Sequence, residues 1–122
     1  MKKICYLLGF CIIFVLLYSC EDKRKKNNFD QSLIPGKWGQ GLLFEKYFSD
    51  GTGYTWDEND DVKEDEAQRF TWTLEKDQLT QIHVGEMGQK VPKLYTVTEL
   101  TSSSFKYRDD YGTYYSFTKV NQ

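Results

Sequence analysis

The chain has 122 residues, with 16 Lys and Arg against 18 Asp and Glu and a formal net charge of −2. A chain of this length holds one small domain, and a mildly acidic composition without a basic stripe argues against a nucleic-acid partner. Aromatic residues make up 16% of the chain and only 2 residues are proline, a composition that favours β-strands.

Residues 1–19 have the pattern of a secretory signal peptide. Lys2 and Lys3 give the positively charged start, and residues 4–18 form an almost purely apolar run. This run is shorter than the roughly 20 apolar residues that a transmembrane helix needs, and it lies where the apolar segment of a signal peptide is found. We therefore expect residues 1–19 to be removed during export.

The apolar run ends in Leu17-Tyr18-Ser19-Cys20, and charged residues follow at once. This motif resembles the bacterial lipobox. In that family the cysteine thiol is joined to diacylglycerol, a lipoprotein signal peptidase cuts before the cysteine, and the new amine is acylated. The resemblance implies lipidation at Cys20 and a mature protein anchored in the cell envelope, on either face of the outer membrane. Several acyl chains make such an anchor stable, because each buried methylene contributes roughly 0.8 kcal/mol.

The cysteines agree with an exported lipoprotein. Cys5 and Cys11 leave with the signal peptide and Cys20 carries lipid, so the mature chain has neither a disulfide nor a free thiol. Cysteine nucleophiles and metal–thiolate sites are thereby excluded. Without Lys2 and Lys3, 14 bases remain against 18 acids, and the mature chain has a net charge of −4.

The mature chain divides into a tether and one domain. Residues 20–32 comprise the lipidated cysteine and a charged linker, EDKRKKNNFDQS, of the kind that holds a domain off a membrane. Residues 33–122 form the folded domain. The four consecutive bases at 23–26 can contact anionic lipid headgroups, at about 1 kcal/mol each.

The domain shows the two-residue alternation of β-strands along most of its length. Phe70, Trp72 and Leu74 share one face, with Thr71 and Thr73 on the other. An Asp-Gly pair within residues 49–53 predicts a tight hairpin turn. Residues 61–70 can form one turn of helix. We predict eight short antiparallel strands: one around residue 38, then 43–48, 53–57, 69–74, 79–84, 93–100, 104–108 and 113–120.

Eight strands joined by hairpins can close into an up-and-down barrel, stay half open, or pack as a sandwich. Gly36-Lys37-Trp38, the series FSDGTGYTW and FTWTL, and the closing YSFTKV resemble the lipocalin-like domain of bacterial envelope lipoproteins of the Bacteroidota type. The resemblance covers residues 34–120. It implies a small antiparallel eight-stranded barrel, closed or half open, in which Trp38 plugs one end and has a packing role.

Aromatic side chains supply the candidate sites. A barrel this small is just wide enough to be filled by side chains or to hold one small ligand. We expect inward-pointing aromatics at Trp56, Phe70, Trp72, Tyr95, Tyr107 and Phe117. The candidate ligand-binding residues among them are Trp56, Trp72, Tyr95 and Tyr107, although filling of the core is the favoured interpretation for Phe70 and Trp72. A candidate interaction patch at a hairpin tip comprises Tyr111, Tyr114 and Tyr115.

No set of residues predicts catalysis or a metal centre. Asp57, Asn59 and Asp61 match the first alternate ligands of a calcium loop, but Val62 and Gln68 break the pattern. A solvated loop is therefore the favoured interpretation, with weak calcium binding left open.

The single histidine, His83, is expected to be a half-exposed strand residue, and the serines at 102–104 lie in an expected turn. No nucleophile elbow accompanies that histidine, and most carboxylates fall in predicted turns and loops. We therefore predict no catalytic residues and no cofactor.

These observations lead to two functional expectations. The first is a membrane-anchored, non-enzymatic lipoprotein of the cell envelope that binds a small apolar or amphipathic ligand. The alternative is a protein-interaction or inhibitor module with a filled barrel, which would use the aromatic loop patch to bind an envelope protein. An unfilled pocket would favour the first expectation, and an exposed aromatic patch would favour the second.

Overall fold

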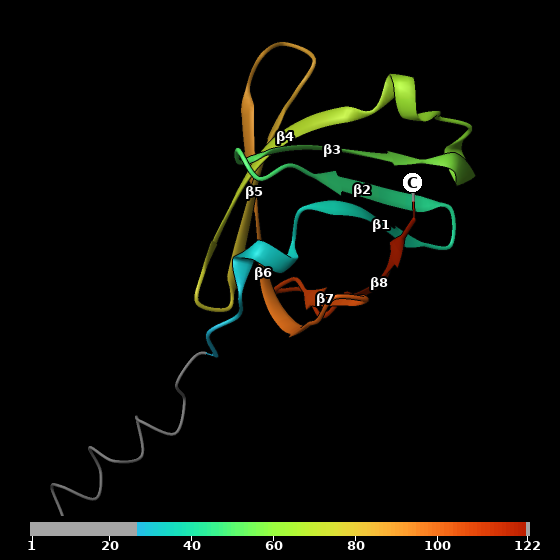
Figure 1. Ribbon diagram of the computed structural model, residues 1–122. Helices are drawn as coiled ribbons and strands as arrows, with labels where there is room; N and C mark the ends of the chain where they lie inside the picture. The colour runs from blue at the N-terminus through green and yellow to red at the C-terminus, as the bar shows by residue number, and fades with distance from the viewer. Residues whose placement is uncertain (1–26, 122) are drawn as a thin grey trace, which may run out of the picture.

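A computed structural model describes residues 27–121 (Figure 1). The predicted signal peptide, the lipidation site Cys20 and the first part of the tether, residues 21–26, lie outside the described residues. Within 27–121, no helix is long and apolar enough to cross a membrane.

Eight antiparallel strands form one closed sheet, in which each strand pairs with the next along the chain and the last pairs with the first (Figure 1). This confirms the predicted all-β, up-and-down barrel, and the sheet is closed. The strands are β1 (Gly36–Gln40), β2 (Leu43–Tyr47), β3 (Thr52–Asp57), β4 (Gln68–Glu75), β5 (Gln78–Val84), β6 (Lys90–Leu100), β7 (Ser104–Arg108) and β8 (Tyr114–Val120).

The seam that closes the barrel is short. Strand β8 pairs with β1 through Lys37 with Val120, Trp38 with Lys119, and Gly39 with Thr118. Closure gives every described strand a partner on both sides, which protects the sheet against edge-to-edge aggregation. Residues 27–121 contain every strand of the closed sheet and the whole core, so they form a complete folding unit.

The observed strands lie close to the predicted ones. The largest difference is β6, which begins at Lys90 instead of residue 93 and includes Pro92 opposite Ile82. The connection between β3 and β4 is an exposed loop with two short 3-10 turns, η2 (Glu58–Asp60) and η3 (Glu64–Glu66). The second of these is the predicted helical turn.

One end of the barrel is plugged by the residues that precede β1. The 3-10 turn η1 (Gln31–Leu33) leads to Ile34, which is fully buried. The indole nitrogen of Trp38 donates to the carbonyl oxygen of Ile34 at 2.8 Å, and its ring packs edge-on against Phe105. The packing role predicted for Trp38 is confirmed. We call this the closed end.

Aromatic residues fill the middle of the barrel. The buried core cluster comprises Ile34, Trp38, Tyr47, Phe70, Trp72, Leu79, Val97, Leu100, Phe105, Tyr107 and Phe117. Tyr47 lies at its centre and makes edge-on contacts with Phe70, Trp72 and Phe105. The interior is therefore solid from the closed end to about the level of Tyr47.

Candidate functional site

The opposite end of the barrel is hollow. A cavity of about 440 Å³ opens there, beside the loop between β3 and β4. We call it the cup. Its floor is formed by Glu45, Gln81, His83 and Tyr107, its wall includes Leu43, Thr55, Tyr95 and Tyr115, and its rim carries Asp57, Asp60, Glu66 and Lys93.

The floor is built around a buried carboxylate. Alternation along β2 places Glu45 inside the barrel, two residues before the core residue Tyr47. Glu45 is only 5% exposed. The hydroxyl of Tyr47 donates to its Oε1 at 2.7 Å, and the hydroxyl of Tyr107 donates to its Oε2 at 2.8 Å. Gln81 Nε2 donates to the Tyr47 hydroxyl at 2.7 Å and approaches Glu45 Oε2 at 3.5 Å.

The polar network continues to His83, two residues beyond Gln81 on β5. His83 Nε2 lies 2.8 Å from Gln81 Oε1, and Nδ1 lies 3.2 Å from Gln68 Oε1. The histidine is 4% exposed, so the prediction of a half-exposed strand residue is wrong. Its inward position follows from the alternation with Gln81 and Leu79, which are both buried.

Burial governs the protonation of these groups. It raises the pKa of Glu45 from its ordinary value, although hydrogen bonds from Tyr47, Tyr107 and Gln81 act in the opposite direction. Burial lowers the pKa of His83 to about 4, with a smaller contribution from the charge of Lys93. At neutral pH the imidazole is therefore uncharged, and it can donate only one N–H.

Three tyrosine rings form an aromatic wall that rises from the floor, where the hydroxyl of Tyr107 contacts Glu45. The ring centroids of Tyr95 and Tyr107 are 4.5 Å apart, those of Tyr107 and Tyr115 are 5.1 Å apart, and those of Tyr95 and Tyr115 are 5.9 Å apart. They come from β6, β7 and β8, whose inward positions are adjacent at this level. Tyr95 and Tyr115 remain partly exposed, so their rings are available to a ligand.

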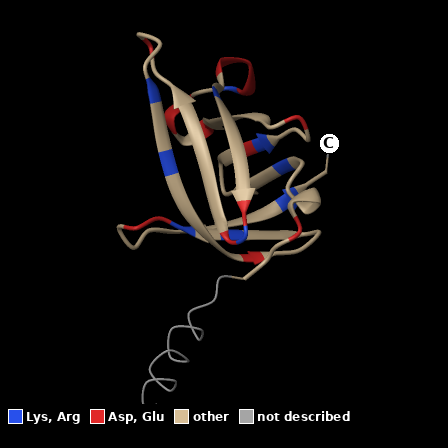
Figure 2. Ribbon diagram, turned by 90° about the vertical axis from the view of Figure 1, so that its left-hand side faces the viewer, with Lys and Arg blue, Asp and Glu red and all other residues tan. Residues whose placement is uncertain are grey.

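The rim of the cup is acidic. Asp57, Asp60 and Glu66 lie on or beside the loop between β3 and β4, whose two short coils are largely red in Figure 2. Lys93 is the one basic residue among the described residues that line the cup. A side pocket of about 400 Å³ shares Lys93, Tyr95 and Tyr115 with the cup and adds Asp109, Asp110 and Tyr111.

Of the four predicted ligand-binding residues, Tyr95 and Tyr107 line the cup directly. Trp72 lies deeper, where its indole nitrogen donates to the carbonyl oxygens of Phe48 and Thr52, both at 3.1 Å. These carbonyls flank the turn between β2 and β3, which lies at the closed end. Trp72 is therefore a packed core residue and does not line the cup.

Trp56 does not point into the barrel as predicted. Its ring stacks on Phe44 at 5.2 Å and contacts Tyr54, and the ammonium of Lys37 lies 5.2 Å from its centroid. Phe44 alternates with the inward Glu45, so these rings cover the outside of the sheet. Trp56 is buried there by its neighbours, at the edge of the cup.

The predicted tyrosine patch is divided by the fold. Tyr111 is 94% exposed and Tyr114 is 70% exposed, whereas Tyr115 turns inward against Tyr95 and Tyr107. Tyr111 and Tyr114 thus remain candidates for an interaction surface. Tyr115 belongs to the wall of the cup.

The candidate calcium residues serve the local backbone. Asp57 Oδ1 accepts from both the backbone and side-chain nitrogens of Asn59, and Asp61 ends η2 in a left-handed conformation. Among residues 27–121, no group of three or more His, Cys, Asp and Glu side chains is arranged to hold a metal ion.

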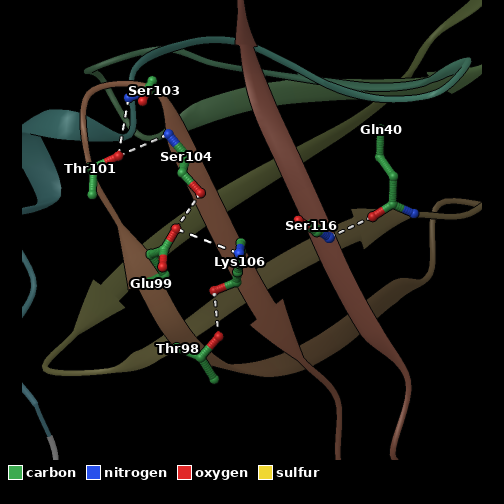
Figure 3. A network of polar contacts seen from close by, with 8 residues as sticks. All are labelled: Gln40, Thr98, Glu99, Thr101, Ser103, Ser104, Lys106 and Ser116. Carbon is green, nitrogen blue, oxygen red and sulfur yellow. Dashed lines mark hydrogen bonds and ion pairs between the residues drawn. The ribbon is translucent and has the colours of Figure 1, made fainter.

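The serine-rich segment forms a turn at the closed end, between β6 and β7 (Figure 3). Thr101 Oγ1 accepts from the backbone nitrogens of Ser103 and Ser104, and Ser104 Oγ donates to Glu99, which also pairs with Lys106. The His83 ring nitrogens lie beside Gln68 Oε1 and Gln81 Oε1 instead. The described structure therefore does not bring this histidine to these hydroxyls.

Sequence reasoning missed Glu45 and Gln81 in the floor of the cup. Glu45 and Gln81 are polar residues at inward positions of otherwise apolar strand faces, Leu43-Glu45-Tyr47 and Leu79-Gln81-His83. That interruption is a usable signal, because a buried polar group is retained only with hydrogen-bond partners. The tyrosines that provide those partners come from distant strands.

Fold and site together define a class: a closed eight-stranded up-and-down β-barrel with one plugged end and one open cup that has a polar floor. Comparison of the chain with protein-family models, curated proteins and solved structures finds no match.

Proposed function

We propose that this protein is an envelope lipoprotein, anchored through Cys20, that binds a small amphipathic molecule in the cup without catalysing a reaction. The lipobox-like motif at residues 17–20 supports the anchor and a location at the outer membrane. The cup supports the binding role.

The observation that carries the binding role is an unfilled cavity in an otherwise solid barrel. Its volume of about 440 Å³ lies within the range of small-molecule sites, roughly 300–1,000 Å³. Tyrosine rings offer apolar area, which contributes about 25 cal/mol per Å² when a ligand covers it. The hydrogen-bonded floor offers polar partners. A ligand with both an apolar body and a polar head matches this combination better than a hydrocarbon does.

One observation favours a second candidate, an interaction module. Tyr111 and Tyr114 lie near the tip of the hairpin between β7 and β8 and are largely exposed. Exposed tyrosines are enriched where proteins bind one another. This candidate needs no ligand in the cup, so it makes a different prediction for the experiment below.

The test uses residues 27–122, which include the complete barrel, incubated with envelope extract and examined by native mass spectrometry. We expect a reproducible small-molecule adduct that is lost in Tyr115→Ala, because this ring forms part of the cup wall. Tyr114→Ala is the matched control and should retain the adduct.

If the natural barrel and both variants show only the mass of the bare protein, the binding role is contradicted. The same extract passed over immobilised protein would then test the interaction module. In that case Tyr114→Ala and Tyr111→Ala should reduce capture of a partner, and Tyr115→Ala should not.

A further inference from the structure

The chemistry of the cup narrows the ligand class, and this inference rests on the proposed binding function. We propose that the cup selects small organic cations, in which an ammonium head points to the floor and an apolar body lies against the tyrosine wall. Three features carry the proposal: the charge around the opening, the acceptor groups of the floor, and the aromatic wall.

The charges around the opening favour a cation. Asp57, Asp60 and Glu66 line the rim and Glu45 the floor, against Lys93 alone. The adjoining side pocket adds Asp109 and Asp110. A recessed site lined by one sign of charge concentrates the field and raises the local concentration of oppositely charged ligands. The same field would repel an anionic ligand.

The floor still has capacity to accept a hydrogen bond. A carboxylate has about four acceptor positions. Those of Glu45 accept from Tyr47 at Oε1, and from Tyr107 and Gln81 at Oε2. One position at Oε1 therefore remains for a ligand N–H. A charged N–H donor suits this position best, because hydrogen bonds between ionised partners are about twice as strong as neutral ones.

The tyrosine wall can bind both the charge and the apolar body of an organic cation. The three tyrosine rings, whose centroids lie 4.5 to 5.9 Å apart, present π-faces and edges around one space. A cation over a tyrosine face gains about 0.5–2 kcal/mol, most where water is excluded. An alkyl or aryl body also covers the apolar area of the rings.

The experiment compares three probes that share a phenyl ring and a short carbon arm: phenethylammonium, 2-phenylethanol and phenylacetate. Each is titrated into residues 27–122, and amide chemical shifts identify the site and give Kd. We expect phenethylammonium to bind at least tenfold more tightly than phenylacetate, with shifts at Glu45, Tyr95 and Tyr115. Its affinity should fall as salt rises, since screening weakens charge attraction.

Two variants should change affinity for the ammonium probe in opposite directions. Glu45→Gln keeps the shape but removes the charge, and should weaken binding about tenfold, the equivalent of 1.4 kcal/mol. Lys93→Gln removes the basic residue of the rim and should tighten binding. Glu99→Gln makes the same chemical change as Glu45→Gln, but on the hairpin at the closed end, and should have no effect.

The outcomes separate this inference from the function it rests on. Equal binding of the three probes in the cup, or tighter binding of phenylacetate, would overturn the preference for cations and leave a binding protein. Tighter ammonium binding that both Glu45→Gln and Lys93→Gln leave unchanged would also overturn it. If no probe shifts a cup residue, the inference fails, whereas the adduct experiment still decides the binding function.

Discussion

His83 and Glu45 respond to pH in opposite senses although they belong to one hydrogen-bonded floor. The folded protein holds the pKa of His83 at about 4, against an ordinary value of 6.5. Between these pH values the unfolded chain binds a proton that the folded chain does not, so His83 lowers stability as the pH falls. The raised pKa of Glu45 has the opposite effect, because the folded carboxyl keeps its proton to a higher pH than the unfolded one does.

This opposition predicts the behaviour of His83→Gln, whose side-chain nitrogen can replace Nε2 as the donor to Gln81. As the pH falls from 6.5 to 4, the free energy of unfolding of the natural protein should decrease by an amount due to His83, and this decrease should be absent from the variant. For His83 alone the loss is at most ~3 kcal/mol.

Urea unfolding at pH 7, 5.5 and 4 measures this difference. Glu45→Gln is the matching control, and it should make the loss of stability on acidification steeper. Parallel pH profiles for the natural protein and His83→Gln would contradict the neutral state assigned to the histidine.

Trp56 shows that alternation within one strand does not decide which of its two faces points into the barrel. Strand β3 has aromatic residues at one set of alternate positions, Tyr54 and Trp56, and Gly53 and Thr55 at the other. The aromatic set faces outward. A Cβ on Gly53 would lie 2.6 Å from the backbone oxygen of Lys46 on β2 and 2.7 Å from the ring of Phe70 on β4, so this inward position has no room for a side chain. Only the packing of β2 and β4 on either side of β3 reveals this requirement.

At the scale of elements, the segment leading into β1 holds the closed end together. Gly36 has φ of 135°, which side-chain-bearing residues rarely adopt, and a Cβ there would lie 2.7 Å from Lys119 Nζ. That ammonium donates to the carbonyl oxygen of Pro35 at 3.1 Å and lies 4.3 Å from the ring centroid of Trp38. Gly36 therefore permits Lys119 of β8 to contact both Pro35, which precedes β1, and Trp38 within β1.

Gly36→Ala should lower the free energy of unfolding by about 2 kcal/mol, through backbone strain and displacement of Lys119. Gly88→Ala is a matched control, because Gly88 has φ of 81° and a Cβ added there would meet no other atom within 4 Å. The control should show the strain alone, about 1 kcal/mol. Thermal or urea unfolding measures both. Equal losses would mean that the Lys119 contact contributes nothing to stability.

The strands could be predicted from the sequence because turn signals and alternation are local. The strands predicted at residues 69–74 and 79–84 lie within β4 and β5. Closure could not be predicted in the same way, since it depends on the pairing of β1 with β8 across nearly the whole domain. The cup likewise depends on side chains from β2, β5, β6, β7 and β8 meeting at one level. Its tyrosines were candidates from the sequence, but its carboxylate floor was not.

At the scale of the whole molecule, the proposed anchor makes a prediction about fractionation. Cys20→Ala should abolish retention of the protein in the membrane fraction, because the proposed lipid is attached through this thiol. Cys11→Ala, within the predicted signal peptide, is the matched control and should fractionate like the natural protein. Detergent-free separation of membranes, followed by immunodetection, measures both. Cys20→Ala protein that still sediments with membranes would contradict the lipoprotein proposal.

The described chain enters the barrel at the closed end, where the backbone nitrogen of Phe29 lies 3.5 Å from the carbonyl oxygen of Lys76 in the turn between β4 and β5 (Figure 1). The cup opens at the other end. A tether from Cys20 to Asn27 spans at most roughly 25 Å when extended. With the proposed lipid on Cys20, this short tether would place the plugged base nearer the bilayer and leave the opening facing the aqueous compartment. The proposed ligands would then reach the cup by diffusion through water, so their solubility as monomers, rather than their partition into lipid, would set how often the cup is occupied.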